Sequence, residues 1–403
     1  MAGAGRRIFQ PGEILTASNT MNYLMDQAVQ VYAGTAARGS AIGSAVSEGM
    51  ISYLADSNAV EVYNGSAWNQ VSQAISPNYV INGGFDIWQR GTSFSVNPAY
   101  TADRWQIAFG GTGTAQTASQ QAFTAGSAPV SGYEGTYFLR NVVTGGSGTG
   151  SVVVVQQPIE DVRTLAGQTA TVSFWAKAST GTPNLGYDLY QSFGSGGSAT
   201  VGGIGAGKVT LSTSWTRYSF TVAVPSIAGK TIGTNHALVL RLWFSSGSDY
   251  NSLNGSIGIQ SNTFDVWGVQ LEAGSTATPF RRNANSIQGE LSACQRYFRR
   301  YTSINGDEIM WNGTWYETTA LWVPMVFPVP MRAKPVVSYS GTINCYGGGG
   351  SSLTTSIDEY VGGVPTGNGG VYTFKNSGGN TTGRSGFVGL ANAGNYIQFN
   401  AEL

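Results

Sequence analysis

The feature that most constrains the fold is an alternation of short β-rich runs with glycine- and serine-rich turns between about residues 78 and 282. The clearest runs are residues 137–143, 151–157, 170–176, 185–193, 215–224, 237–244 and 262–272. No convincing helical stretch interrupts them. Many short strands without helices are typical of an antiparallel sandwich or jelly roll. We therefore expect an all-β fold, with a jelly-roll β-sandwich over residues 78–285.

Within three runs, apolar residues occupy every second position, as expected when one face of a strand is buried. The three sets are Val172, Phe174 and Ala176; Tyr218, Phe220 and Val222; and Leu238, Leu240 and Leu242. Neighbouring residues on a strand face opposite sides of the sheet, so Phe174 and Trp175 cannot both be core residues on one face. We expect Trp175 to be an exposed or interfacial ring, and Trp215 and Trp267 to be packing residues.

The composition excludes several classes of function. Only 10% of the 403 residues are charged, 57 are glycine, and the formal net charge is zero. Without a basic excess, no long-range field attracts nucleic acid or acidic lipid. No window approaches the roughly 18 apolar residues of a membrane span, and no apolar stretch follows Arg6 and Arg7 as in a secretory signal. We expect no nucleic-acid partner and no membrane partner.

The amino-terminal region contains the best helix candidate, residues 16–32. Its apolar stripe consists of Met21, Leu24, Met25, Ala28 and Tyr32, at helical spacing. A helix of this length needs a partner for its stripe, either within its own small domain or in a homotrimeric anchoring bundle. We assign residues 1–34 to an anchoring segment. Residues 35–77 are predicted to form a small β-meander, with a hairpin at Asn64-Gly65, followed by a linker.

The carboxyl-terminal region, residues 286–403, is predicted to contain a linker helix within 286–300 and then a second β-domain. Cys294 and Cys345 are far apart and show no zinc or disulfide spacing, so we expect two free thiols.

Several motifs in the middle region carry a resemblance to a known family. They read NGGFDIWQRGTSF (82–94), YTADRW (100–105), QPIEDVRTLAGQTATVSFWAKAS (157–179), FGSGGS (193–198), SWTRYSFTVAVPSIAGKTIG (214–233), FDVWGVQLEAGSTATPF (264–280) and ELSACQRYFRRY (290–301). In this order they resemble a domain that recurs in bacteriophage tail fibre and minor tail proteins. The segments FQPGEILTASNTMNYLMDQAV (9–29) and EGMISYLADSNAVEVYNGSAW (48–68) resemble amino-terminal segments of phage fibre-like proteins.

The resemblance implies a jelly-roll unit similar to carbohydrate-binding modules, carried on a virion appendage. It implies a homo-oligomer, with a trimer expected, that is assembled in the host cytoplasm and exposed on the released particle. The amino-terminal segment would dock on tail or capsid proteins, and the sandwich would adhere to host-surface polysaccharide. The alternative is a purely architectural head fibre or tail decoration that contacts only virion proteins.

Trp175, Trp88 and the tripeptide Asp103-Arg104-Trp105 are the candidate glycan-binding residues. An exposed indole can stack on a pyranose face while Asp103 and Arg104 bond to hydroxyls, since binding sites combine apolar surface with a few polar groups. The structural alternative for the tripeptide is a salt bridge that locks a sheet edge over a core indole. Trp88 allows the same two interpretations.

A polysaccharide depolymerase would require two carboxylates at a defined separation. Glu160 with Asp161, and Asp307 with Glu308, are adjacent and would point to opposite faces of a strand. The single histidine, His236, is interpreted as a turn residue, so no nucleophilic triad is indicated. We predict no catalytic residue, cofactor or metal site. Scattered aspartates could still hold Ca²⁺, and a depolymerase remains open only if distant carboxylates converge.

Overall fold

The computed structural model describes residues 12, 14, 16–17, 29–57, 59–71, 77–130, 133–306, 308–347, 350–359 and 366–403. The chain divides into two compact units, Met1–Ser76 and Pro77–Leu403, and each is described by itself.

The first unit contains a four-stranded sheet in the order β1-β2-β3-β4. Its strands are β1 (Gln30–Tyr32), β2 (Ile51–Leu54), β3 (Ala59–Tyr63) and β4 (Trp68–Gln70). β2, β3 and β4 are antiparallel neighbours, as the sequence predicts for a meander. The β3–β4 turn is held by Asn64, whose Oδ1 accepts hydrogen bonds from the backbone of Ser66 and Ala67.

The predicted helix over residues 16–32 is wrong at its carboxyl-terminal end. Tyr32 lies in β1 and pairs in parallel register with Leu54 of β2, because pairing with a sheet outweighs the marginal stability of a short helix. Met21, Leu24, Met25 and Ala28 lie outside the described residues. A short helix near the amino terminus is present as α2 (Thr35–Ile42), followed by the 3-10 turn η2 (Gly43–Ala45).

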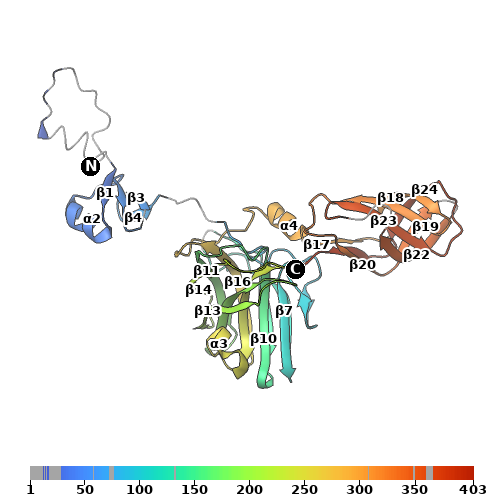
Figure 1. Cartoon of the computed structure of the whole chain (residues 1–403), viewed down its shortest axis with the longest axis horizontal. Helices are drawn as coiled ribbons and strands as arrows, with labels where there is room; N and C mark the ends of the chain where they lie inside the picture. Colours follow the sequence, from blue (N-terminus) through green and yellow to red (C-terminus); the bar gives the residue numbers. More distant parts are fainter. Residues whose placement is uncertain are drawn as a thin grey trace. The chain divides into compact units, whose positions relative to one another are not determined.

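The second unit begins with a sandwich of two six-stranded sheets (Figure 1). The front sheet has the order β13 (Val201–Thr210), β12 (Asn184–Ser192), β15 (Ala237–Ser246), β10 (Ser147–Ile159), β7 (Gln106–Thr112), β6 (Ala99–Tyr100). The back sheet has the order β14 (Thr216–Ala223), β11 (Thr169–Ala178), β16 (Asn262–Ala273), β9 (Tyr137–Thr144), β8 (Ala115–Ala122), β5 (Ser93–Phe94). The long strands pair antiparallel, and the predicted all-β fold is confirmed.

The core of the sandwich lies between the two sheets and follows the predicted alternation. Leu238, Leu240 and Leu242 of β15 and Val172, Phe174 and Ala176 of β11 are buried there. Val222 is also buried in this core, and Tyr218 and Phe220 pack against it. The residues between the three leucines, Val239 and Arg241, therefore face outward from the front sheet.

After the sandwich, the helix α4 (Ile287–Gln295) begins behind Ser286, whose side chain accepts a hydrogen bond from the backbone of Gly289. The predicted helix is shorter than expected, because residues 298–302 form a strand instead. Three strands make one sheet in the order β17 (Phe298–Thr302), β25 (Tyr396–Asn400), β20 (Val336–Ser340). Six strands close a barrel in the order β18 (Glu308–Glu317), β19 (Ala320–Val326), β23 (Gly369–Asn376), β22 (Gly350–Glu359), β21 (Ile343–Gly347), β24 (Ser385–Leu390).

These strands form the carboxyl-terminal module, which has its own apolar core. Cys294 and Cys345 are both free and buried, as predicted. In the part of the chain that the structure describes, no helix is long and apolar enough to span a membrane.

Candidate functional site

One row of polar side chains crosses the outer face of the front sheet. Strand register pairs Asp188 with Arg241, and Arg241 with Gln156. It then pairs Gln156 with Gln106, and Gln106 with Tyr100. Residues directly opposite each other on neighbouring strands point to the same face. These five residues, which we call the polar row, therefore form a line across β12, β15, β10, β7 and β6.

Arg241 is held rigidly in the row by Asp188. Its Nε donates to Asp188 Oδ1 at 2.8 Å, and its Nη2 donates to Oδ2. The guanidinium carbon lies 4.5 Å from the ring centroid of Tyr190 and 4.6 Å from that of Trp243. Within the described residues, Nη1 of Arg241 has no hydrogen-bond partner, so this nitrogen is the donor available to a ligand.

Asp188 is the fixed support beneath this arrangement. It is fully buried and also accepts hydrogen bonds from Trp243 Nε1 at 2.9 Å and from the backbone of Gly203 at 3.2 Å. Burial, the largest effect, raises the pKa of Asp188, and the hydrogen bonds from Arg241 and Trp243 partly oppose that shift. Asp188 therefore positions Arg241 and is not itself open to a ligand.

Gln156 and Gln106 continue the row as a pair of amides. Gln156 Nε2 donates to Gln106 Oε1 at 2.7 Å, and both side chains are half-buried. No partner for Gln156 Oε1 or Gln106 Nε2 is found among the described residues. The row thus presents a guanidinium donor, an amide acceptor and an amide donor in sequence, a pattern that matches ligands whose hydroxyls both donate and accept.

The rows on either side of the polar row are buried. On one side, Trp243 and Val154 are covered by the turn η3 (Ser248–Tyr250) and helix α3 (Asn251–Asn254), with Ile257 in the same small cluster. On the other side, Val239 and Pro158 are buried although they face outward. The polar row is therefore a partly accessible strip between two rows that are buried at their centres.

The structure does not support Asp103-Arg104-Trp105 as a glycan-binding surface, because all three side chains are buried. Trp105 belongs to the sandwich core, and its Nε1 donates to the Asn82 carbonyl at 3.0 Å. An indole inside the core cannot stack on a pyranose. The structural interpretation holds for the tripeptide, with different ion-pair partners from those expected.

The charges of this tripeptide join the sandwich to the carboxyl-terminal module. Arg104 forms an ion pair with Glu402, and its guanidinium lies 3.5 Å from the ring centroid of Tyr297. Asp103 accepts a hydrogen bond from the backbone of Gln89 at 3.0 Å and lies 3.7 Å from Arg90 Nη1. These contacts are structural and leave no open surface.

The other two predicted glycan-binding residues, Trp88 and Trp175, are half-buried and lie apart from the polar row. Trp88 packs on the core, stacks on Phe94, and donates its Nε1 hydrogen to the Phe85 carbonyl at 2.7 Å. Trp175 lies on the outer face of the back sheet, in register with Trp267. The prediction that Phe174 and Trp175 face opposite sides is confirmed, since only Phe174 is in the core.

The outer face of the back sheet carries a cluster of rings that contact one another. The aromatic cluster consists of Phe123, Tyr133, Phe138, Trp215, Trp267 and Phe280. Trp267 is fully buried at its centre, as expected for a packing residue. The faces and edges of the rings pack against one another, so this cluster resembles a second small core and not a binding platform.

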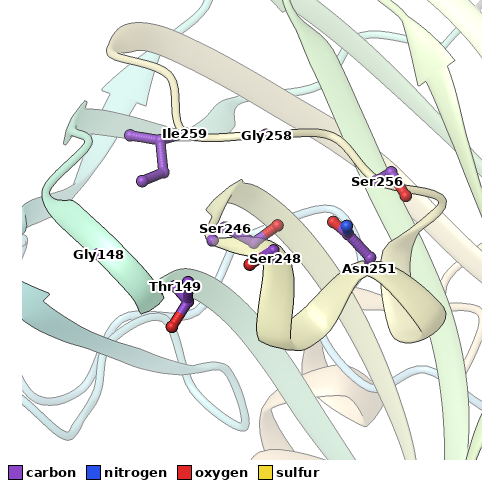
Figure 2. Close-up of a pocket in the computed structure, with 9 residues that line it drawn as sticks. Gly148, Thr149, Ser246, Ser248, Asn251, Ser256, Gly258 and Ile259 are labelled. Atoms are coloured by element: carbon purple, nitrogen blue, oxygen red, sulfur yellow. The ribbon is translucent and has the colours of Figure 1, made fainter.

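A pocket of about 520 Å³ lies at one end of the sandwich, beside α3 (Figure 2). Its lining is Gly148, Thr149, Ser246, Gly247, Ser248, Asn251, Ser256, Gly258 and Ile259. No charged or aromatic side chain belongs to this lining. The polar row is the stronger candidate, because its hydrogen-bonding groups are held in place beside aromatic rings.

The carboxylates considered for catalysis do not form a hydrolytic pair. Glu160 accepts hydrogen bonds from Arg296 Nε at 2.9 Å and Tyr297 Oη at 2.7 Å, whereas Asp161 pairs with Arg163. Burial acts to raise the pKa of Glu160, but these hydrogen bonds outweigh it and leave the pKa lowered. A general acid of a glycosidase requires the opposite shift.

The remaining residues considered for catalysis or metal binding make local contacts or lie outside the described residues. Glu308 accepts backbone hydrogen bonds from Ile304 and Asn305, and Asp307 lies outside the described residues. His236 accepts a hydrogen bond from the backbone of Val162 at 3.4 Å. Among the described residues, no group of histidine, cysteine and carboxylate side chains could hold a metal ion.

Sequence reasoning missed the polar row. One signal for part of it was present: if Leu238, Leu240 and Leu242 face the core, Arg241 must face outward between them. The partners Asp188, Gln156 and Gln106 come from strands far apart in the chain and required the strand register.

No family model matches the chain, and no curated protein matches it. Solved structures with similar parts include a family 11 carbohydrate-binding module from Clostridium thermocellum in complex with a β-1,3-1,4-mixed-linked tetrasaccharide (12% identity, 46% of this chain, 98% of that chain, TM-score 0.26). The CBM22-1 xylan-binding domain from Paenibacillus barcinonensis is another (10% identity, 51% and 100%, TM-score 0.27). A tailspike protein 4 domain of bacteriophage CBA120 matches over 49% of this chain and 21% of that one (14% identity, TM-score 0.29). At these TM-scores, the fold assignment rests on the two sheets of the chain itself.

Proposed function

We propose that this chain is an adhesion subunit whose sandwich binds saccharides through the polar row. The observation that carries the proposal is the register that places Arg241, Gln156 and Gln106 side by side on three neighbouring strands. Their planar hydrogen-bonding groups are fixed before a ligand arrives, which lowers the entropic cost of binding. The aromatic ring of Tyr190 flanks the same strip.

The charge balance of the row favours a neutral ligand. Asp188 neutralises Arg241 through two hydrogen bonds, so the row carries no net charge to attract phosphate or sulfate. Hydroxyl groups match the remaining donors and acceptors better than an anion does. A neutral polyhydroxylated ligand, such as a host-surface saccharide, is the chemical class that fits.

The proposed setting is a bacteriophage virion, with the chain as a tail fibre or spike subunit. The resemblance of residues 82–94, 100–105, 157–179 and 264–280 to phage appendage proteins supports this setting. A single row offers few contacts, so we propose a homo-oligomer, a trimer by that resemblance, in which repeated sites supply avidity. We propose adhesion without catalysis, cofactor or metal.

A purely architectural role is the second candidate, and it would use exposed apolar side chains for contacts with virion proteins. Ile304, Val326 and Val336 of the carboxyl-terminal module are 78%, 84% and 71% exposed. Such residues are typical of surfaces that contact other proteins when they lie close together. In this role the chain would connect virion proteins and bind no saccharide.

A glycan array followed by isothermal titration calorimetry with the full chain tests the proposal. The variant Gln156→Ala removes one member of the row, and Gln121→Ala is the matched control, because Gln121 is a half-buried glutamine on β8 of the back sheet. We expect Gln156→Ala to weaken binding about ten-fold, the worth of one hydrogen bond, and Gln121→Ala and Trp175→Ala to leave it unchanged. If the folded chain binds no saccharide on the array, the proposal fails and the architectural role is favoured.

A further inference from the structure

We infer that the polar row recognises a short saccharide unit, at a chain end or a branch, and not the interior of an extended polysaccharide. The inference rests on the proposed function and adds the form of the ligand. It follows from how the fold closes both ends of the row.

The end of the row at β12 and β13 is closed by α3. Asp188, the last member of the row on this side, is fully buried. Next to it, β13 carries Gly203, and a Cβ added there would lie 3.2 Å from the Ser252 carbonyl oxygen and 3.3 Å from Leu253 Cδ2. Helix α3 therefore packs directly over the glycine backbone of β13. A saccharide cannot extend past Asp188 in this direction.

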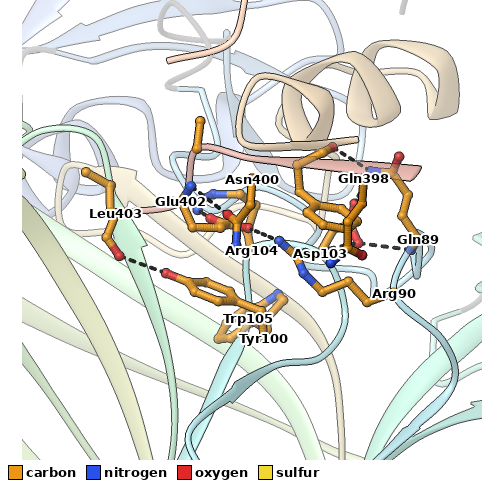
Figure 3. A network of polar contacts seen from close by, with 12 residues as sticks. Gln89, Arg90, Tyr100, Asp103, Arg104, Trp105, Gln398, Asn400, Glu402 and Leu403 are labelled. Carbon is orange, nitrogen blue, oxygen red and sulfur yellow. Dashed lines mark hydrogen bonds and ion pairs between the residues drawn. The ribbon is translucent and has the colours of Figure 1, made fainter. Parts of the chain in front are cut away.

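The other end of the row is closed by the segment 401–403. Tyr100 on β6, the edge strand, donates its hydroxyl hydrogen to the Leu403 carbonyl at 3.0 Å (Figure 3). The ring and hydroxyl of Tyr100 are thus engaged with the chain. Among the described residues, the front sheet has no strand beyond β6 that could continue the row.

The segment 401–403 is anchored strongly enough to act as a fixed wall. Arg332 Nε donates to the Ala401 carbonyl at 2.9 Å, and its Nη2 donates to the Glu402 carbonyl at 2.9 Å. The Glu402 carboxylate lies 2.9 Å from Arg90 Nη2 and forms a buried ion pair with Arg104. A buried, paired carboxylate is costly to pull away from its partners.

What stays accessible is the stretch formed by Arg241, Gln156 and Gln106, on three neighbouring strands. Neighbouring strands are about 4.8 Å apart, so this stretch spans roughly 10 Å. The rows beside it are buried at their centres, at Trp243 on one side and at Val239 on the other, which limits sideways extension. A mono- or disaccharide fills such a stretch, and further sugar units would lie outside it.

The test compares saccharides of different length and position on the full chain. The probes are neutral mono- to hexasaccharides printed on an array, each sugar displayed once as a terminal unit and once as an internal unit, with calorimetry on those that bind. We expect terminal display to be preferred, and affinity to change by less than about two-fold beyond the disaccharide, because added units make no contacts. Affinity that rises steadily to the hexasaccharide, or equal binding of internal units, would overturn the inference while leaving the proposed function intact.

A wall-opening variant provides the second arm. Tyr100→Ala removes the ring that ends the row and its bond to Leu403. Tyr316→Ala is the control, because Tyr316 is an exposed tyrosine on β18 of the carboxyl-terminal module and belongs to neither the row nor the wall. If the wall sets ligand length, Tyr100→Ala gains binding of internally displayed sugars, and Tyr316→Ala does not. An unchanged preference in a folded Tyr100→Ala chain, checked by its thermal unfolding curve, would contradict the role of the wall. Absence of binding to every printed saccharide would instead refute the proposed function itself.

Discussion

The two outer faces of the sandwich each carry one bidentate arginine–aspartate pair, but they use it differently. On the front sheet, Arg241 is clamped to Asp188 beneath two aromatic rings. On the back sheet, Arg140 Nε lies 2.7 Å from Asp265 Oδ1, and Lys177 Nζ lies 3.6 Å from the same carboxylate. Arg140 is 35% exposed, whereas the front pair is mostly buried. The back pair therefore leaves its arginine partly in water above a buried carboxylate that it shares with Lys177, whereas the front pair holds one free donor in place for the proposed ligand.

The aromatic residues follow the same contrast. The rings of the back sheet pack against one another around Trp267. Tyr190 and Trp243 of the front sheet instead pack against the guanidinium of Arg241. The comparison teaches that tryptophan content alone does not locate a binding face. The face that we propose to bind saccharide is the one whose polar groups are held in place and still have unused donors and acceptors.

Truncation of the aromatic cluster is expected to have the largest effect, on stability alone. Trp267→Ala removes a fully buried ring and should lower the free energy of unfolding by about 4 kcal/mol through the cavity it leaves. Urea denaturation measures this change. Saccharide binding by the folded fraction should remain at the wild-type level, and a folded Trp267→Ala chain without binding would mean that the back face contributes to the site.

Removal of the two arginines compares the faces directly. Arg241→Met leaves Asp188 buried without its main partner, so it should cost about 3 kcal/mol of stability and abolish saccharide binding. Arg140→Met should cost less, about 1 kcal/mol, because Arg140 is itself partly exposed and the buried Asp265 keeps Lys177 as a partner. Denaturation and calorimetry on both variants provide the readouts. Equal effects of the two variants would remove the distinction between the faces.

The inward side of each strand could be predicted from sequence, whereas the site could not. Alternation alone places Leu240 and Phe174 in the core, and this is confirmed because burial of apolar side chains decides that choice locally. The pairing of Asp188 with Arg241 joins positions 53 residues apart, and strand order and register depend on the whole sheet. The same limit explains why the sequence left two interpretations open for Trp105, of which the core indole is the one that the structure shows.

The amino-terminal region shows a second limit of prediction from sequence. The apolar spacing up to Tyr32 satisfies a helical pattern, yet Tyr32 pairs with Leu54 in a sheet. A short apolar run is compatible with either structure, and the tertiary partner decides between them.

A pH titration is expected to have the smallest effect on saccharide binding, and it tests the contact between Asp188 and Arg241. Because burial raises the pKa of Asp188, this carboxylate becomes protonated at a higher pH than an ordinary aspartate. Protonation weakens its hold on Arg241, so saccharide binding should decline as the pH falls through that raised pKa. Calorimetry at successive pH values from neutral to acidic measures the decline.

Folding stability should move in the opposite direction, which separates the two roles of Asp188. A carboxyl whose folded pKa is raised contributes most to stability below its unfolded pKa, and this contribution is lost as the pH rises through the folded value. Relative to Asp188→Asn, which cannot titrate, the wild-type chain should therefore gain stability in acid while it loses binding. If Asp188→Asn shows the same pH profile of binding as the wild type, another group controls the decline, and Asp188 does not position Arg241 for the ligand.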